Sequence, residues 1–194
     1  LGEWIIRDVC TQVKEWQTQG LPAIKVSVNL SVAQLMHHQF LKSVKMILDE
    51  TELDAKWLEF EIPESVLFRK EESVLKTLQG IKKLGITLAL DNFGTGYSFL
   101  NNLSTYGFDV IKMDRSIIDD IETSQESYEV VMSIVKLAQK LNKHVVAHGI
   151  ETNGQLELVN QIGFDESQGF LFSKPVESHR FESLLREEAE ERLH

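Results

Sequence analysis

Side chains that can bind a metal or move a proton recur at one place in this sequence, the carboxyl ends of its predicted strands. These side chains are Asn29, Glu61, Asp91 with Asn92, Lys112 with Asp114, His148 with Glu151, and Gln168. Parallel strands that close into a barrel bring their carboxyl ends to one mouth, so the groups are expected to face one site. Purely structural strand ends would offer mostly turn-forming residues.

The chemistry that fits this set is metal-assisted attack on a phosphoester. Asn29, Glu61 and Asp91 carry hard oxygen atoms of the kind that bind Mg²⁺ or Mn²⁺. Lys112 adds a positive charge that could stand beside a phosphate or an attacking water. Each acid taken singly is more often a strand-end cap or a salt-bridge partner, so the inference depends on their joint placement.

The elements that must position these groups are short β-branched runs separated by longer helical patterns. Six runs are predicted to be strands: 25–30, 57–62, 86–90, 110–113, 144–149 and 168–172. Such alternation predicts right-handed crossovers and a parallel sheet, either doubly wound or closed as a barrel, of which we favour the barrel. Because eight strands and about 250 residues are typical of a barrel, we expect two further units before Leu1.

Apolar residues at helical spacing predict the helices. Three of them are expected at 4–16, 74–84 and 130–141. Thr152 and Gln155 form a capping-box pair that opens another helix, which ends at Gly163. The tryptophans Trp4, Trp16 and Trp57 lie on apolar faces and are expected in the core.

Composition narrows the class of partner. Twenty Lys and Arg against thirty Asp and Glu give a net charge of −10. This charge does not attract duplex nucleic acid or an acidic membrane, which are both negatively charged. No apolar run approaches the roughly 20 residues of a membrane span, so we expect no membrane contact by this domain itself, although it could belong to a membrane-anchored protein. The single cysteine, Cys10, excludes an internal disulfide and fits the cytoplasm.

Six ordered motifs resemble those of EAL domains, which are cyclic di-GMP phosphodiesterases and their inactive relatives. The motifs are 29–31 (NLS), 61–65 (EIPES), 91–98 (DNFGTGYS), 112–116 (KMDRS), 147–151 (AHGIE) and 168–172 (QGFLF). The resemblance extends from about Leu1 to Pro175. It implies an α/β fold, a modified TIM-type (β/α) barrel with one antiparallel strand, whose first strands are lacking here.

The resemblance also implies the reaction and the roles of the residues. Two divalent cations, Mg²⁺ or Mn²⁺, would activate a water that cuts cyclic di-GMP to linear pGpG. The implied metal ligands are Asn29, Glu61, Asp91 and Asn92; the implied catalytic positions are Lys112, Glu151 and His148; the implied ligand-binding residues are Gln168, Gly169, Phe170 and Pro175. The loop 93–98 would couple metal binding to dimerisation.

Three departures from the family pattern predict a damaged centre. Asn92 stands where the family has the second of two aspartates, so one negative charge opposing two dications is lost. His148 replaces a glutamate, and an imidazole of ordinary pKa about 6.5 does not restore that charge. Pro63 replaces a threonine beside Glu61. Because losing one charge-positioning group costs on the order of a hundredfold in rate, little turnover is expected.

The expectation is therefore a degenerate EAL domain over residues 1–180, followed by a charged helix or tail at 181–194. It would act as a receptor for cyclic di-GMP or as a protein-interaction module, as a homodimer or with a protein partner, and with sensor or cyclase-type domains beside it. Such a module could work without any metal. The alternative is an active metal-dependent phosphodiesterase, if a Glu-Ala-Leu motif precedes Leu1.

Overall fold

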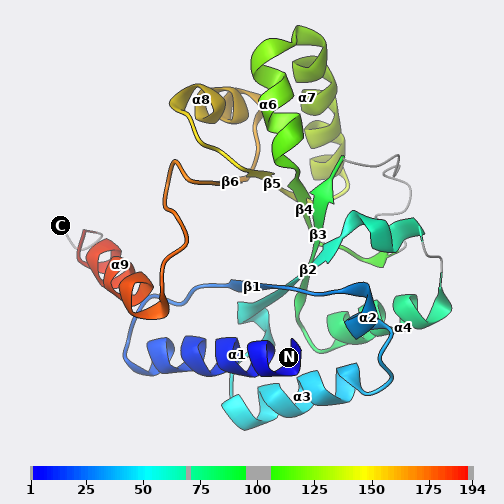
Figure 1. Cartoon of the computed structure of the whole chain (residues 1–194), viewed down its shortest axis with the longest axis vertical. Helices are drawn as coiled ribbons and strands as arrows, with labels where there is room; N and C mark the ends of the chain where they lie inside the picture. Colours follow the sequence, from blue (N-terminus) through cyan, green and yellow to red (C-terminus); the bar gives the residue numbers. More distant parts are fainter. Residues whose placement is uncertain (1, 69–70, 95–105, 192–194) are drawn as a thin grey trace.

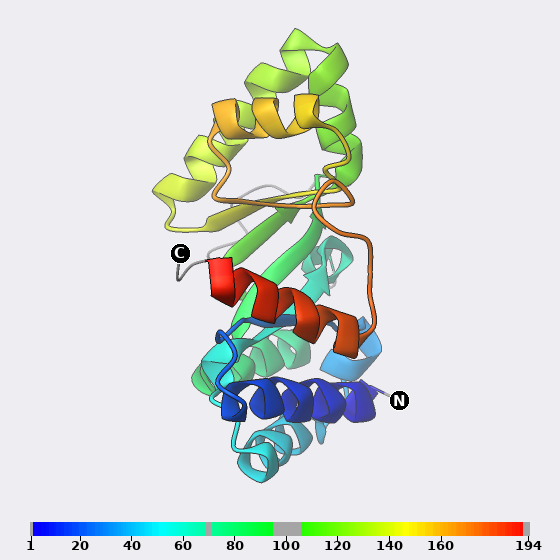
Figure 2. The same ribbon diagram turned by 90° about the vertical axis from the view of Figure 1, so that its left-hand side faces the viewer.

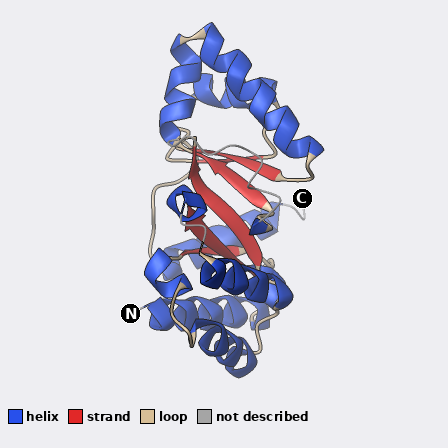
Figure 3. Ribbon diagram, turned by 90° about the vertical axis from the view of Figure 1, so that its right-hand side faces the viewer, coloured by secondary structure: helices blue, strands red, loops and turns tan. Residues whose placement is uncertain are grey.

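The computed structural model describes residues 2–68, 71–94 and 106–191. Within them, six strands form one sheet in the order of the chain, and each neighbouring pair is parallel. The strands are β1 (Val26–Asn29), β2 (Leu58–Pro63), β3 (Thr87–Phe93), β4 (Val110–Met113), β5 (His144–His148) and β6 (Glu166–Gln168). The sheet curls into a half-barrel with helices outside it, which confirms the predicted α/β class (Figures 1 and 3).

The helices fall into groups along the sheet (Figure 1). The first group is α1 (Gly2–Thr18), α2 (Val32–Leu35), α3 (Phe40–Thr51) and α4 (Glu72–Lys83), with the 3-10 turns η1 (Ala55–Trp57) and η2 (Glu64–Phe68). The second group is α6 (Arg115–Thr123), α7 (Gln125–Lys140) and α8 (Asn153–Ile162). The helix α9 (Ser178–Glu191) lies across the open side of the sheet, between α1 and β6 (Figure 2).

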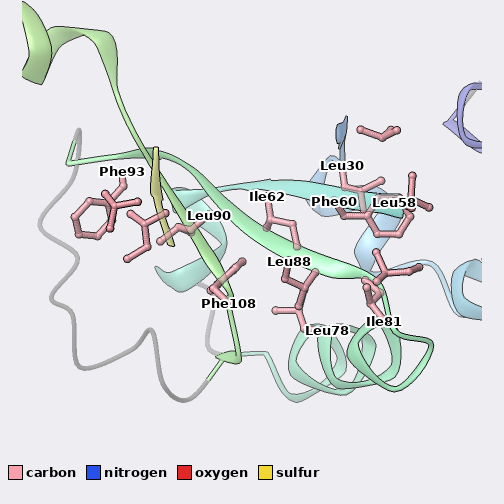
Figure 4. Close-up of a cluster of buried hydrophobic side chains, with 14 of the residues drawn as sticks. Leu30, Leu58, Phe60, Ile62, Leu78, Ile81, Leu88, Leu90, Phe93 and Phe108 are labelled. Atoms are coloured by element: carbon pink, nitrogen blue, oxygen red, sulfur yellow. The ribbon is translucent and has the colours of Figure 1, made fainter. Parts of the chain in front are cut away.

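The outward face of the strands is apolar because it packs on the helices. Alternate residues of β2 and β3, including Phe60 and Leu88, point toward α4, which contributes Leu78 and Ile81 (Figure 4). All four of these side chains are fully buried. Burial of this face leaves the alternate side chains of each strand on the inner, concave face.

Local signals set the helix ends. The predicted capping box is confirmed: the Thr152 hydroxyl accepts the Gln155 N–H at 3.1 Å, and the Gln155 side chain returns to the Thr152 N–H. Gly163 ends α8 in the left-handed region at φ 91°, as predicted. Asp114 caps α6 by accepting the Ser116 N–H at 2.9 Å.

The prediction for the tryptophans is partly wrong. Trp16 is buried, with its ring centroid 5.5 Å from that of Phe181 in α9. Trp4, however, is 63% exposed. The buried stripe of α1 includes Ile6 and Cys10, and a residue two positions before Ile6 points to the other side of a helix.

The sixth strand was predicted in the wrong place. It was expected at 168–172, but β6 ends at Gln168, and Phe170 and Phe172 are more than half exposed. Aromatic residues favour strands, yet here the chain turns, with Phe172 N–H donating to the Gly169 carbonyl at 3.1 Å.

Two further findings bear on the sequence expectations. The antiparallel strand that the resemblance implies is not among the six described strands. In the described part of the chain, no helix combines the length and apolar character that a membrane span requires.

The turn after β6 predicts a steric requirement at Gly169. A Cβ there would overlap the main chain of Ile150, to which this segment is bound by the Leu171 N–H. We expect Gly169→Ala to lower the free energy of unfolding by about 1–3 kcal/mol, measured by urea denaturation. Gly154→Ala is the control, because its Cβ would meet the end of the Glu122 side chain at 3.3 Å and Thr152 Oγ1 at an ordinary contact distance of 3.8 Å, which are both side-chain contacts. Equal stability of both variants would contradict the prediction.

The buried thiol of Cys10 gives a second prediction. Burial raises the pKa of Cys10 to about 11, despite the opposing charge of Arg7. At about pH 8 the folded protein should therefore react with Ellman's reagent far more slowly than the urea-unfolded chain, because the thiolate is the reactive form. Similar rates in the two states would show that α1 opens readily.

Candidate functional site

The concave face of the sheet encloses a cavity of about 1270 Å³. Six residues predicted from strand ends line it together: Asn29, Glu61, Asp91, Lys112, His148 and Gln168. They come from all six strands, so the structure brings this part of the predicted set to one place.

Strand register explains the convergence. Asn29 pairs with Glu61 across β1 and β2, and His148 pairs with Gln168 across β5 and β6. Side chains of paired residues in a parallel sheet point to the same face. The polar positions therefore form an arc along the carboxyl ends of the strands.

Beside these polar positions, the inner face carries small apolar residues. Ala89, Val110 and Val146 form a separate buried cluster on neighbouring strands β3, β4 and β5. Their small size leaves space above them, which the side chain of Lys112 enters.

Lys112 is the buried cation of the cavity, with 6% of its surface exposed. Its ammonium donates to Glu61 and lies 3.2 Å from Glu59 Oε1 and 3.4 Å from Ser27 Oγ. Burial alone would lower the pKa of Lys112, but the hydrogen bond and charge of Glu61, with those of Glu59, raise it above its ordinary value. Lys112 is therefore a fixed positive charge.

Asp91 and Asn92 form a bulge at the end of β3. Leu90 pairs with Ile111 and Phe93 pairs with Met113, so β3 holds one more residue than β4 over this stretch. Asn92 adopts φ 55°, a conformation that asparagine tolerates, and its amide donates to Asp91 Oδ2 at 2.7 Å. The bulge turns Asp91 into the cavity, while Asn92 is exposed.

The carboxyl group of Asp91 lies in an anionic environment. Burial and then the charge of Glu61 raise the pKa of Asp91 above its ordinary value. The Asn92 backbone N–H, His148 and Lys112 act in the opposite direction. Asp91 and Glu61 thus share a cavity in which the buried cation, Lys112, also pairs with Glu59.

His148 and Glu151 lie on different sides of the β5–α8 turn. His148 lines the cavity, whereas Glu151 pairs with Arg115 of α6 at 3.0 Å between Oε2 and Nη2. Between them, Gly149 has φ 89°, and a Cβ there would lie 2.7 Å from Arg115. Glu151 therefore holds the turn against α6 and does not line the cavity.

The predicted ligand-binding residues are divided. Gln168 lines the cavity, and its carbonyl accepts the N–H groups of Gly149 and Ile150 at 2.8 and 3.0 Å. Phe170 and Pro175 are exposed on the segment that follows β6. Of the loop 93–98, residues 95–98 lie outside the described ranges.

Sequence reasoning missed two residues, Glu59 and Ser27. Glu59 is 5% exposed, lines the cavity and accepts a hydrogen bond from Ser27 Oγ at 2.8 Å. The signal was present in the alternation of β2, because Glu59 and Glu61 are two residues apart and share a face. Glu59 was not predicted because it lies two residues before the strand-end position of Glu61.

Comparison with known proteins identifies the family. Residues 1–175 match the EAL domain. The chain is 37% identical over 182 residues to the cyclic di-GMP phosphodiesterase PdeR of Escherichia coli strain K12, an alignment that covers 94% of this chain and 27% of PdeR. The chain spans about a quarter of the length of the curated relatives it matches.

Solved structures share the fold. The PaMucR phosphodiesterase in complex with c-di-GMP is 32% identical and superposes with a TM-score of 0.86, over 93% of this chain and 73% of that one. The calcium/cy-diGMP complex of BlrP1 from Klebsiella pneumoniae is 26% identical, with a TM-score of 0.80 over 90% of this chain and 44% of that one. By sequence match and by fold, the chain belongs to the EAL domain family.

Proposed function

We propose that this EAL domain binds cyclic di-GMP in its cavity and acts as a receptor or regulatory module with little phosphodiesterase turnover. One observation carries the proposal: the two replaced carboxylate positions lie at the site, since Asn92 is bonded to Asp91 and His148 lines the cavity. The missing charges are therefore missing where a metal centre would need them.

The remaining donors fit a divalent cation. Asn29, Glu61 and Asp91 offer oxygen atoms to one cavity, and a cation would relieve the repulsion that helps raise the pKa of Asp91. Among the described residues, however, no three His, Cys, Asp or Glu side chains lie close enough to form a metal cluster. The amide of Asn29 and the two carboxylates are then a partial ligand set for a cation.

The metal and the residues of the cavity would have separate chemical roles. A bound Mg²⁺ or Mn²⁺ supplies Lewis-acid activation of water and charge for the phosphate. Lys112 offers a fixed positive charge to a phosphate oxygen. His148 stands where a carboxylate would orient water, and an imidazole brings no negative charge to a second cation.

Cyclic di-GMP suits the cavity in size and chemistry. The cavity has a volume of about 1270 Å³, which exceeds the roughly 300–1,000 Å³ of most small-molecule sites. This volume leaves room for a dinucleotide. Gln168 can hydrogen-bond a guanine edge, and the exposed ring of Phe170 can stack on a base. Relatives named as cyclic di-GMP phosphodiesterases, or solved with that ligand, support this assignment.

The regulatory role extends to the whole protein that contains this domain. The chain spans about a quarter of the length of its curated relatives, which supports a domain that works beside others, such as sensor or cyclase-type domains. Dimerisation or a protein partner would then transmit the bound state.

A second candidate function is active hydrolysis. It is favoured by the residues that still match the family pattern. Asn29, Glu61, Asp91 and Lys112 still share one cavity. The receptor and the enzyme differ in turnover and not in what they bind.

Calorimetry tests binding. Cyclic di-GMP titrated into the protein with Ca²⁺ should bind with micromolar or tighter affinity and more weakly after chelation with EDTA, because the carboxylates otherwise repel the phosphates. Gln168→Ala should reduce the affinity at least tenfold, while Gln161→Ala on α8 should not. Absence of heat from the wild type would point to a protein-interaction module.

Restoring the charges tests the loss of catalysis. The double variant Asn92→Asp, His148→Glu should raise the rate of pGpG formation with Mn²⁺ by on the order of a hundredfold or more, since each positioned charge is worth about that much. Chromatography of the products measures the rate. Rapid turnover by the wild type that disappears in Glu61→Ala would refute the receptor proposal and establish the enzyme.

A further inference from the structure

We propose that Glu59 is a positioning residue: it is the second counter-ion of Lys112, and it holds this cation in place when a divalent metal takes Glu61. The inference rests on the cation site of the proposed function and deepens it. No role for position 59 follows from the strand-end motifs.

The contacts of Lys112 are the first step. Its ammonium bonds to Glu61 and also lies 3.2 Å from Glu59 Oε1. Ser27 Oγ donates to the same Glu59 oxygen at 2.8 Å and lies 3.4 Å from the ammonium. Lys112 therefore has two anionic partners, and one of them is itself held by a hydroxyl.

Strand geometry separates the roles of the two glutamates. Two residues along a strand span about 6.6 Å, so Glu59 lies one step deeper than Glu61. Asn29 pairs with Glu61, and Asp91 lies at the neighbouring strand end, whereas Glu59 pairs with Thr87. A cation among the strand-end oxygens can take Glu61 while Glu59 stays with Lys112.

The side chain of Lys112 can cross β3 because the residue of β3 on its path is small. Lys112 lies on β4 and its partners lie on β2, so its stem crosses β3. The residue of β3 that pairs with Glu61 is Ala89, which belongs to the apolar cluster of the inner face. A long side chain is thus able to reach both glutamates over a methyl group.

Competition for Glu61 makes Glu59 necessary. A buried ammonium without an anion is costly, so Lys112 would resist the transfer of Glu61 to a metal if Glu61 were its sole partner. With Glu59 beside it, Lys112 keeps one carboxylate in either state. Glu59 therefore favours metal binding through Lys112 and without touching the metal.

Calcium calorimetry on the protein tests this. Glu59→Gln should weaken Ca²⁺ binding on the order of tenfold, the lower end of the effect of losing an outer-shell partner. Ser27→Ala should shift the affinity in the same direction by less. The control is Glu157→Gln, which removes one exposed carboxylate from α8 and should leave the affinity unchanged.

A double-mutant cycle separates positioning from simple loss of charge. In the Lys112→Met background, Glu59→Gln should have little effect on Ca²⁺ affinity, because there is no ammonium left to hold. An equal loss in both backgrounds would show that Glu59 acts only as a charge and would overturn the inference. Thermal melts of each variant establish that it is folded, and Ser27→Ala serves if Glu59→Gln is not.

The outcomes remain distinct from those of the proposed function. If the cycle shows coupling while cyclic di-GMP gives no heat, the positioning role stands and the receptor proposal fails. If cyclic di-GMP binds but Glu59→Gln behaves as Glu157→Gln, the inference alone fails. Absence of Ca²⁺ binding by the wild type overturns the inference together with the metal site.

Discussion

The alternation of side chains along parallel strands is the constraint on which this structure depends. One face of each strand is apolar because it must exclude water against the helices, as Phe60 and Leu88 do against α4. The other face is then free to carry charge. Residues 59 and 61 are placed together by the same geometry that buries residue 60 between them. The alternation of side chains along β2 therefore determines both the core and the lining of the cavity.

The carboxylates of the half-barrel outnumber the buried cation beside them, Lys112. Lys112 offsets part of the charge of Glu59 and Glu61, and Asp91 remains with a raised pKa. A carboxylate at 92 or 148 would add anionic charge that only metal ions could balance. The amide at 92 and the imidazole at 148 add no negative charge to this set.

Much of the fold could be predicted from the sequence, because the hydrophobic periodicity and the residues that begin and end the elements give strong signals. The strand at 110–113 and the capped helix at 153–162 were predicted closely, since β-branched runs, a capping box and a terminal glycine give local signals. The end of the sheet was not, because the turn at Gly169 is fixed by contact with Ile150, which no local pattern encodes. Likewise, convergence of strand ends was predictable from topology, whereas the partnership of Lys112 with Glu59 depends on the small residue between their strands.

The carbonyl of residue 168 bonds to two consecutive amides of the neighbouring turn. That architectural task belongs to the main chain, which is the same for every amino acid. The side chain at 168 is thus relieved of any part in holding the sheet together. In evolutionary terms, a lineage can exchange the side chain at this position without losing the main-chain bonds that join the turn to the sheet.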